Sequence, residues 1–400
     1  MLDRVKIFNG PIIHQQQIQH GVCLLIENGK ILDVVREDVD FPDAKLIDAR
    51  GNFVSPGFID IHIHGGGGAD FMDGTVEAYL QIAETHAKHG TCSLLPTTLT
   101  CEKVDLIQTL EAYQQAKISN TKGADFIGMH LEGPYFALAQ RGAQDPKFIR
   151  DPDPAEYREI LESFDFIKRW SAAPELKGAV EFGKYVSSKG VLAAIAHTDA
   201  IYEEVIEAFE HGGFTLATHF YSAMSGVTRR NAFRYAGVIE SAYLLDDMDV
   251  EIIADGVHLP APLLKLIYKI KGPDRIALIT DAMRAADMPE GKSVLGSYKN
   301  GLHVIVEDGV AKVPDRTTFA GSVATADRLL KTMLDLAEVP LVEAVQMMTT
   351  TPARIMGISA QKGSFAKNSD ADVVLFNQQI EIQHTIVKGH SVYQKTTQAP

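Results

Sequence analysis

Two histidines separated by one residue stand in the segment PGFIDIHIHGGGG and carry the clearest chemical potential in the chain. Because side chains alternate between the two faces of a strand, His62 and His64 would project from the same face. The glycines at 65–68 follow at once and leave open space beside both imidazoles. Neutral imidazole is the commonest metal ligand in proteins, so the pair indicates half of a metal site. A histidine pair alone is a weak signal, and this interpretation depends on ligands elsewhere.

Polar residues that could complete such a site recur where later apolar segments end. They are Glu132, His197, His219, Asp255, His258 and Asp281. Each one alone has a structural explanation, such as a buried aspartate satisfied by backbone amides. Their recurrence at corresponding positions favours metal chemistry.

The apolar segments that carry these residues alternate with stretches of helical periodicity, such as 76–90 and 200–212. Strands are predicted over residues 53–64, 91–98, 125–133, 168–175, 191–199, 214–220, 250–258 and 275–282. Eight such units predict an α/β fold, a TIM-like (β/α)8 barrel, with a doubly wound sheet as the alternative. In a barrel the carboxyl ends of the strands meet at one face, so residues far apart in sequence would line one cavity.

The two ends of the chain have a different sequence pattern. The first fifty residues predict short strands and turns, with an Asn-Gly turn signal at Asn28–Gly29, and the last forty residues are similar. We therefore expect a small β-sandwich domain built from residues 1–52 and 360–400. The barrel would occupy residues 53–359.

Composition limits the classes of partner. The formal net charge of −14 argues against nucleic acid, because phosphate binding needs clustered lysine and arginine. An anionic substrate would need local positive charge from a metal or a few arginines. Three cysteines without CxxC spacing indicate reduced thiols and a cytoplasmic protein. No signal peptide and no apolar run long enough for a membrane span is evident.

Seven motifs together resemble a known family. PGFIDIHIHGGGG, HLEGPYF, AHTDA, THFYSAM, ADGVHL, ITDAM and FAGS are similar to those of the N-acetylglucosamine-6-phosphate deacetylases of the amidohydrolase superfamily. The resemblance covers essentially the whole chain and implies a barrel of the metal-dependent hydrolase type. HLEGP with the later histidine motifs is more specific to these deacetylases than the histidine pair is.

The resemblance implies one or two divalent metals per chain, zinc or iron. It assigns Glu132, His197 and His219 to a metal site that all members share. Some members lack the His62 and His64 pair and keep one metal. This chain retains the pair, so it resembles the two-metal members, with Glu132 as the bridging carboxylate.

The resemblance also implies the acid–base residue. Asp281 corresponds to the catalytic aspartate of the family. A bound metal lowers the pKa of water towards 7, so a nearby carboxylate can accept its proton. The same carboxyl group would then protonate the departing amine.

Substrate contacts follow from the resemblance as well. The family binds phosphate with an arginine that matches Arg230 by its spacing from His219, with Arg229 and Arg234 as competitors. Relatives commonly follow this arginine with Glu-Pro-Gly, whereas this chain has NAFRYAG. In relatives the arginine can reach across a subunit boundary, which implies a homodimer.

Other expected substrate contacts are Gln144, Ser222, Ala223, His258 and Phe319. Gln144 stands where some relatives have histidine, and Ser222 where relatives usually have asparagine. Main-chain donors around Ser222 and Ala223 would survive that change. Phe319 would limit the size of the acyl group. His130, Asp60 and Glu175 also match family positions, where we expect supporting roles.

The resulting prediction is a cytoplasmic, metal-dependent enzyme that hydrolyses the acetamide of the phosphosugar N-acetyl-D-glucosamine 6-phosphate. One alternative is the same chemistry on another N-acetyl substrate, such as N-acetylgalactosamine 6-phosphate or an N-acyl-D-amino acid. A second is a cyclic-amide hydrolase or nucleobase deaminase, which usually has a lysine bridge. A third is a non-catalytic binding or scaffold protein that has kept the barrel.

Overall fold

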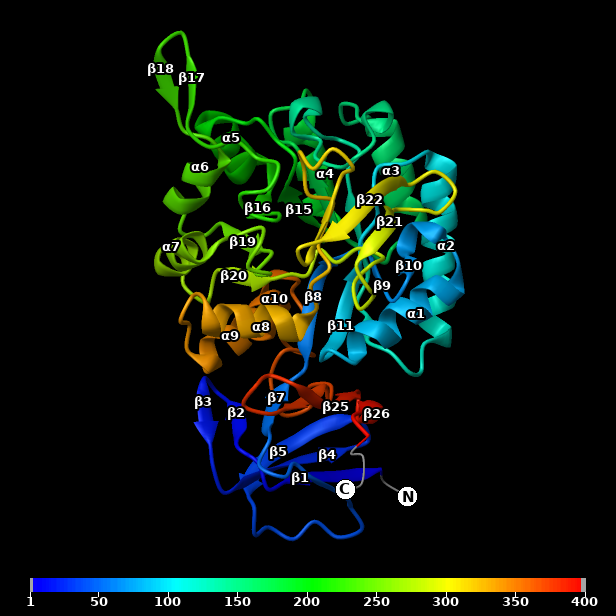
Figure 1. The fold of residues 1–400 in the computed structure, drawn as a ribbon, viewed down its shortest axis with the longest axis vertical. Coiled ribbons are helices and arrows are strands. Elements are labelled where there is room, and N and C mark those ends of the chain that lie inside the picture. The colour runs from blue at the N-terminus through cyan, green and yellow to red at the C-terminus, as the bar shows by residue number, and fades with distance from the viewer. Residues whose placement is uncertain (1–2, 397–400) are drawn as a thin grey trace.

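Eight parallel strands form the centre of the computed structural model, which describes residues 3–396 (Figure 1). They are β8 (Phe58–Ile63), β11 (Thr91–Pro96), β13 (Met129–Glu132), β14 (Ile167–Ala172), β15 (Leu192–Ile195), β16 (Phe214–Ala217), β19 (Asp249–Ile252) and β20 (Ile276–Leu278). Six of them are hydrogen-bonded in the order β13-β14-β15-β16-β19-β20. The other two, β8 and β11, form a second group with the short β12 (Asp125–Phe126). The sequence therefore predicted the barrel correctly.

Backbone contacts join the two groups of strands into a ring. A parallel bridge between Thr97 and His130 connects β11 to β13. On the other side, the Asp281 N–H donates to the His62 carbonyl at 2.9 Å, next to β8 and β20. The barrel is thus closed by two of the residues that the sequence singles out for chemistry.

Ten α-helices accompany the strands within the described residues. They are α1 (Val76–Ala87), α2 (Lys103–Ser119), α3 (Pro154–Ser163), α4 (Ala179–Ser188), α5 (Tyr202–Gly212), α6 (Val238–Leu244), α7 (Ala261–Lys271), α8 (Ala326–Asp335), α9 (Leu341–Met348) and α10 (Thr350–Ile355). Short 3₁₀ helices span Phe71–Asp73, Leu138–Gln140 and Pro146–Phe148. Side-chain caps set some of the starts: Thr75 accepts from the Ala78 N–H, and Asp153 caps α3 with Pro154 in its first turn.

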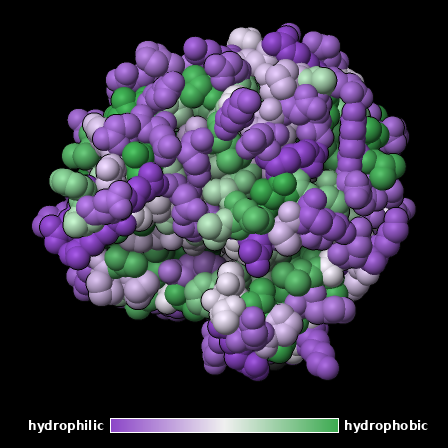
Figure 2. Space-filling view, turned by 90° about the horizontal axis from the view of Figure 1, so that it is seen from above, coloured by the Kyte–Doolittle hydropathy of each residue, from purple (hydrophilic) through white to green (hydrophobic). Residues whose placement is uncertain are grey.

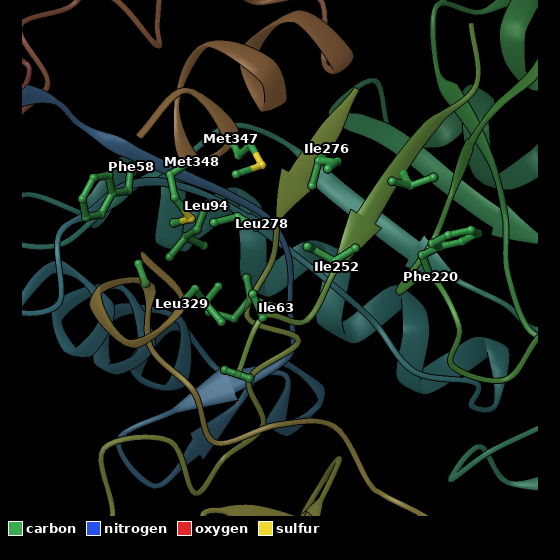
Figure 3. Packing of buried hydrophobic residues seen from close by; sticks show 14 of the residues in the cluster. Phe58, Ile63, Leu94, Phe220, Ile252, Ile276, Leu278, Leu329, Met347 and Met348 are labelled. Carbon is green, nitrogen blue, oxygen red and sulfur yellow. The ribbon is translucent and has the colours of Figure 1, made fainter. Parts of the chain in front are cut away.

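The main core lies between the strands and the surrounding helices. Figure 3 shows Leu94 and Leu278 from the barrel beside Leu329 of α8 and Met347 and Met348 of α9. All five side chains are fully buried. This layer fixes the outer faces of the strands and leaves their carboxyl ends free to carry polar groups.

The two ends of the chain build two sheets below the barrel (Figure 1). One sheet has the order β5-β4-β1-β6, and the other has the order β26-β25-β24-β7-β2-β3. The strands are β1 (Arg4–Phe8), β2 (Ile12–His14), β3 (Gln17–Gln19), β4 (Val22–Glu27), β5 (Lys30–Arg36), β6 (Lys45–Asp48), β7 (Phe53–Pro56), β24 (Val373–Phe376), β25 (Ile382–Val387) and β26 (His390–Gln394). A second core joins residues from both ends, including Ile7, Leu24 and Val373. Residues 1–2 and 397–400 of the expected small domain lie outside the described part.

The predicted strand over residues 53–64 is two strands. β7 pairs with β24 and β2 in the terminal sheet, and β8 belongs to the barrel. Gly57 lies between them, where a Cβ atom would approach the Cys92 side chain to 2.5 Å and the Asp372 Cβ atom to 2.9 Å. The chain passes from sheet to barrel through a space that only glycine fits, so the terminal sheet extends beyond the expected boundary at residue 52.

Three antiparallel elements within the described residues have no counterpart in the predicted pattern. A hairpin of β17 (Thr228–Arg230) and β18 (Phe233–Tyr235) projects from the body of the molecule (Figure 1). A three-stranded sheet of β21 (Gly291–Leu295), β22 (Leu302–Glu307) and β23 (Val310–Lys312) follows β20. The two-residue strands β9 (Gly65–Gly66) and β10 (Ala69–Asp70) pair directly after His64.

Between residues 3 and 396, no helix has both the length and the apolar character that crossing a membrane requires.

A buried histidine holds the glycine segment that follows β8. His86 of α1 is fully buried, and its Nε2 donates to the Gly65 carbonyl at 2.9 Å. Burial lowers the pKa of His86 to about 4. The folded protein therefore keeps this ring neutral over a pH range in which the unfolded chain already binds a proton.

We predict that this difference makes stability fall as the pH falls from 6.5 to 4. An unfolded histidine titrates near pH 6.5, so lowering the pH favours the unfolded chain, by on the order of 3 kcal/mol over this range. His86→Gln keeps a donor for Gly65 and does not titrate. Urea unfolding with a chelator present should show a smaller loss for His86→Gln than for the wild type. Parallel pH profiles would contradict the prediction.

Candidate active site

A cavity of about 360 Å³ opens at the carboxyl ends of the barrel strands. Figure 2 shows this end from above, with hydrophobic residues near the centre of a largely hydrophilic face. Ten of the predicted site residues line the cavity. They are His64, Glu132, Gln144, His197, His219, Ser222, Ala223, His258, Asp281 and Phe319. His62 lies behind them and is fully buried.

Strand ends position the candidate ligands. His62 belongs to β8, and Glu132 is the last residue of β13. His197, His219 and Asp281 follow β15, β16 and β20 and share an unusual backbone, with φ of 48°, 32° and 47°. Non-glycine residues rarely adopt this left-handed region, and such strain concentrates at functional sites.

Four of the five predicted ligands, all histidines, converge on the fifth, the buried carboxylate of Glu132. Glu132 Oε1 lies 3.2 Å from His219 Nε2 and 3.4 Å from both His197 Nε2 and His62 Nε2. Glu132 Oε2 lies 3.5 Å from His64 Nε2. The donor atoms form two groups that could each hold an ion: Glu132 with His62 and His64, and Glu132 with His197 and His219.

The hydrogen bonds of three imidazoles show that this donor set fits a cation. Nδ1 of His64 lies 3.2 Å from the Thr97 carbonyl, Nδ1 of His197 lies 2.8 Å from that of Gln140, and Nδ1 of His219 lies 3.1 Å from that of Ser222. A carbonyl can only accept, so each Nδ1 carries a proton, and in the neutral form of the ring the Nε2 lone pair faces the centre. The Nε2 atoms of His197 and His219 face each other across 3.2 Å.

The electrostatics of the centre also favour a bound cation. Burial opposes ionisation of Glu132, but His62 and the other imidazoles hold its pKa well below the ordinary value. Burial opposes ionisation of Asp281 as well, and His62 and His64 keep its pKa below the ordinary value. Two buried carboxylates are thus ionised side by side, and a divalent ion could take the place of the imidazole protons that balance their charge.

Asp281 stands between the candidate metal ligands and the open cavity. Its Oδ1 lies 3.1 Å from His64 Nε2 and 3.4 Å from His62 Nε2. Its main chain is held at both ends, because its N–H donates to the His62 carbonyl and its carbonyl accepts from the Ser322 N–H at 2.8 Å. The carboxylate is therefore fixed next to the position where a metal would bind.

His258 and Phe319 form one wall of the cavity. The His258 Nδ1 donates to Asp255 Oδ2 at 2.8 Å, and the ring lies 4.7 Å from the Phe319 ring, centroid to centroid. The Asp255 contact leaves Nε2 as the nitrogen of His258 that a ligand can use.

Gln144 has a role that the sequence does not indicate. Its Oε1 accepts from the Thr100 N–H and hydroxyl at 2.9 and 3.0 Å, and its Nε2 donates to Glu132 Oε2 at 2.9 Å. The predicted substrate contact thus also holds the central carboxylate. Ser222 also departs from the prediction. Its N–H donates to the His219 carbonyl, so this main-chain donor is already used within the protein.

The three candidate phosphate-binding arginines lie away from the cavity of their own chain. Arg229, Arg230 and Arg234 are exposed on the β17–β18 hairpin, where Arg229 pairs with Arg234 across the two strands. The Arg230 guanidinium lies over the Tyr235 ring, 5.6 Å from its centroid. Arg230 is close to His219 in the sequence, but the hairpin carries it away from the body of the molecule.

The supporting residues expected from the sequence are buried or half-buried beside the ligands. Asp60 Oδ2 accepts from the Thr280 hydroxyl at 2.5 Å, and His130 Nε2 lies 2.7 Å from the Ser171 hydroxyl. Glu175 accepts from the Thr198 hydroxyl and the Asp199 N–H, both at 2.6 Å, and so braces the turn after His197.

Sequence reasoning missed two groups of residues. Leu99, Leu295, Thr317 and Thr318 line the cavity, and three of them belong to the segment around the β21–β23 sheet, which follows no barrel pattern. Arg169 and Glu251 are fully buried within barrel strands. Each of these strands also carries a second charged residue, Lys168 in β14 and Asp249 in β19, so charge alone did not single out this pair.

Comparison with known proteins agrees with this geometry. The model of the amidohydrolase family matches residues 53–392 of the chain. The chain belongs to this family. Among its amidohydrolase relatives, the N-acetylglucosamine-6-phosphate deacetylase of Bacillus subtilis (strain 168) is 31% identical, with 98% of each chain covered. The N-acetylgalactosamine-6-phosphate deacetylase of Escherichia coli O157:H7 is 30% identical, with 94% of each covered.

A solved amidohydrolase structure is similar over the same length. It is the N-acetyl-D-glucosamine-6-phosphate deacetylase from Mycobacterium smegmatis, as an aspartate-to-alanine mutant in complex with N-acetyl-D-glucosamine-6-phosphate. The TM-score is 0.88 at 28% identity, and the comparison covers 98% of this chain and all of the other. The similarity spans both the barrel and the terminal sheets.

We predict that Glu132→Ala and His197→Ala each remove bound metal while the fold persists. Glu132 is common to both groups of donors, so its loss should empty both, whereas His197 serves one group. Metal content after dialysis and circular dichroism would measure the two effects. His86→Gln, a buried histidine outside the cluster, is the matched control and should keep its metal. Full occupancy in both ligand variants would exclude this site.

Proposed function

We propose that the protein is a metal-dependent deacetylase that converts N-acetyl-D-glucosamine 6-phosphate to D-glucosamine 6-phosphate and acetate. The observation that carries the proposal is the convergence of four imidazoles on Glu132, with Asp281 beside them at the cavity. The names of the relatives support the substrate class.

The proposed cofactor is zinc or iron, in one or two ions per chain. Glu132, His197 and His219 would hold one ion, and His62 and His64 would hold a second with Glu132 shared between them. Imidazole and carboxylate donors suit both metals. When bound, a divalent ion acidifies water and polarises an amide carbonyl.

Asp281 would move the proton in this reaction. Its depressed pKa keeps the carboxylate ionised near neutral pH, so Oδ1 can accept a proton from the attacking water. The same oxygen would then donate that proton to the amide nitrogen as the C–N bond breaks, because an amine leaves poorly unless it is protonated.

The cavity wall would recognise the sugar. We propose that His258 contacts the substrate through Nε2 and that Phe319 limits the acyl group to a small size. Ala223 and Ser222 lie on the turn that also holds His219, and Gln144 retains one N–H beyond its bond to Glu132. Because these groups are arranged around Glu132, they would place the amide of the bound substrate beside Asp281.

Phosphate recognition would come from a second copy of the chain. We propose a homodimer in which the β17–β18 hairpin brings Arg230 to the cavity of its partner. The support is that the hairpin projects and is exposed, while the chain as a whole is acidic, so it needs local cationic groups for an anionic substrate (Figure 1).

A second candidate substrate is N-acetyl-D-galactosamine 6-phosphate. The N-acetylgalactosamine-6-phosphate deacetylase of Escherichia coli O157:H7 is 30% identical to this chain, and the N-acetylglucosamine-6-phosphate deacetylase of Bacillus subtilis is 31% identical. Overall sequence identity therefore does not separate the two epimers. For its location we propose the cytoplasm, with support from three free cysteines, two of them buried.

We predict that Asp281→Asn lowers turnover by roughly two to four orders of magnitude, the usual worth of general acid–base catalysis. Asparagine keeps the shape of the side chain and cannot take the proton. Acetate release by the metal-loaded variant gives the rate, and metal analysis should show unchanged content. If the variant kept more than a tenth of wild-type turnover, another residue would move the proton.

A substrate panel tests the phosphosugar proposal itself. We predict that Arg230→Ala lowers kcat/KM for N-acetylglucosamine 6-phosphate by roughly ten- to a hundredfold, since a charge-assisted contact contributes about 1.5–3 kcal/mol. For unphosphorylated N-acetylglucosamine, kcat/KM should hardly change. Arg229→Ala and Arg234→Ala are the matched controls, and a selective loss in either would reassign the contact. Equal rates on phosphorylated and unphosphorylated sugars would reject the substrate.

A further inference from the structure

A complete ion pair lies inside the barrel, beneath the candidate metal centre. Arg169 of β14 and Glu251 of β19 have no exposed surface. The Arg169 Nη2 donates to Glu251 Oε2 at 2.8 Å, and Nη1 donates to Oε1. The guanidinium also donates to the Thr218 hydroxyl at 2.7 Å and to the Ile61 carbonyl at 3.2 Å. Both charges are thus fixed by several bonds.

Stability alone does not explain this pair. Barrel interiors are normally filled by branched apolar side chains, and moving two charges out of water is costly. Apolar residues of similar size often replace buried ion pairs with no loss of stability, or with a gain. A pair retained here therefore suggests a role in the function of the neighbouring residues.

A second contact of Glu251 points to that role. Its Oε2 lies 3.5 Å from Nδ1 of His62, and this Nδ1 has no hydrogen-bond partner among the residues that the structure describes. The other three imidazoles of the centre each give their Nδ1 proton to a main-chain carbonyl. His62 differs from them, because a side-chain carboxylate faces its Nδ1.

A neighbouring ring restrains His62 from another direction. The His130 ring lies 4.8 Å from the His62 ring, centroid to centroid, at an interplanar angle of 88°. His130 is itself held between the Thr97 and Ser171 hydroxyls at 3.2 and 2.7 Å. The His62 ring therefore has little freedom to turn, and its Nε2 faces Glu132 and Asp281.

We propose that Glu251, anchored by Arg169, is a positioning residue that accepts the Nδ1 proton of His62 and so directs the Nε2 lone pair of His62 to a metal. A carboxylate behind a ligating histidine fixes its tautomer and makes it a stronger ligand. Arg169 keeps Glu251 ionised and stops it from turning into the centre as a ligand itself. This inference rests on the metal site proposed above and assigns a function to two residues outside it.

Two variants separate positioning from stability. Glu251→Gln keeps the volume and weakens the acceptor for His62. The double variant Arg169→Met with Glu251→Leu removes both charges together, so neither charge is left unpaired, although the Thr218 hydroxyl and the Ile61 carbonyl lose a donor. Lys362→Met is the matched control, because Lys362 is a buried lysine paired with Asp125, Asp370 and Asp372, outside the cavity.

The experiment titrates zinc into chelator-stripped full-length protein against a chromophoric chelator and records the visible spectrum of the cobalt form. We expect the wild type to bind two ions and both Glu251 variants to bind one of them ten- to a hundredfold more weakly, the usual effect of losing such a partner. Their cobalt spectra should change. The metal-free double variant should melt no lower than the wild type, whereas Lys362→Met should melt lower and bind both ions normally.

Three outcomes would overturn the inference, and one of them also rejects the proposed second metal site. If both Glu251 variants bind two ions as tightly as the wild type, Glu251 does not position His62. If Lys362→Met loses zinc to the same extent, the effect is a general consequence of destabilisation. If the wild type binds one ion, and His62→Ala with His64→Ala leaves that ion in place, the second metal site is absent and the inference fails with it.

Discussion

The arrangement of the candidate site depends on one buried carboxylate. Glu132 ends its strand inside a ring of four imidazoles, and no arrangement of these groups is stable without charge compensation or careful control of protons. The surrounding contacts serve that control. Main-chain carbonyls fix three histidine tautomers, Gln144 holds one oxygen of Glu132, and the left-handed turns after three strands aim their side chains inwards. The barrel supplies the frame, because only there do the ends of distant strands meet.

The interior of the barrel below the candidate site is unusually polar. Asp60, His130, Arg169, Ser171, Thr218 and Glu251 lie within or beside the strands below the centre, where apolar side chains would pack more simply. Their mutual hydrogen bonds satisfy most of the buried groups, and the outer core of leucine, isoleucine and methionine provides the compensating burial (Figure 3). Stability and chemistry are thus divided between the two faces of each strand.

The sequence predicted the barrel, and it predicted that the candidate ligands lie together at the strand ends, because both follow from local rules. Apolar segments at regular intervals give the strands, and one polar residue after each strand gives His197, His219 and Asp281. Contacts between segments followed no such rule. Gln144 was expected to meet the substrate, and its bond to Glu132 depends on how a loop folds back. The position of Arg230 depends on a short hairpin whose direction is set by tertiary packing. The break at Gly57 depends on the Cys92 and Asp372 side chains, which lie far away in sequence.

The bond from the Asp281 N–H to the His62 carbonyl has a consequence for biosynthesis. It joins the first barrel strand to the last, so the two groups of donors cannot reach their final geometry until about 70% of the chain has left the ribosome. Contacts between segments so distant form late in folding, after the loops between them have been ordered. If these donors hold a metal as proposed, metal loading would therefore be a late step in the maturation of this protein. A chain that stalls before its eighth strand would expose several imidazoles without the geometry that selects one metal over another.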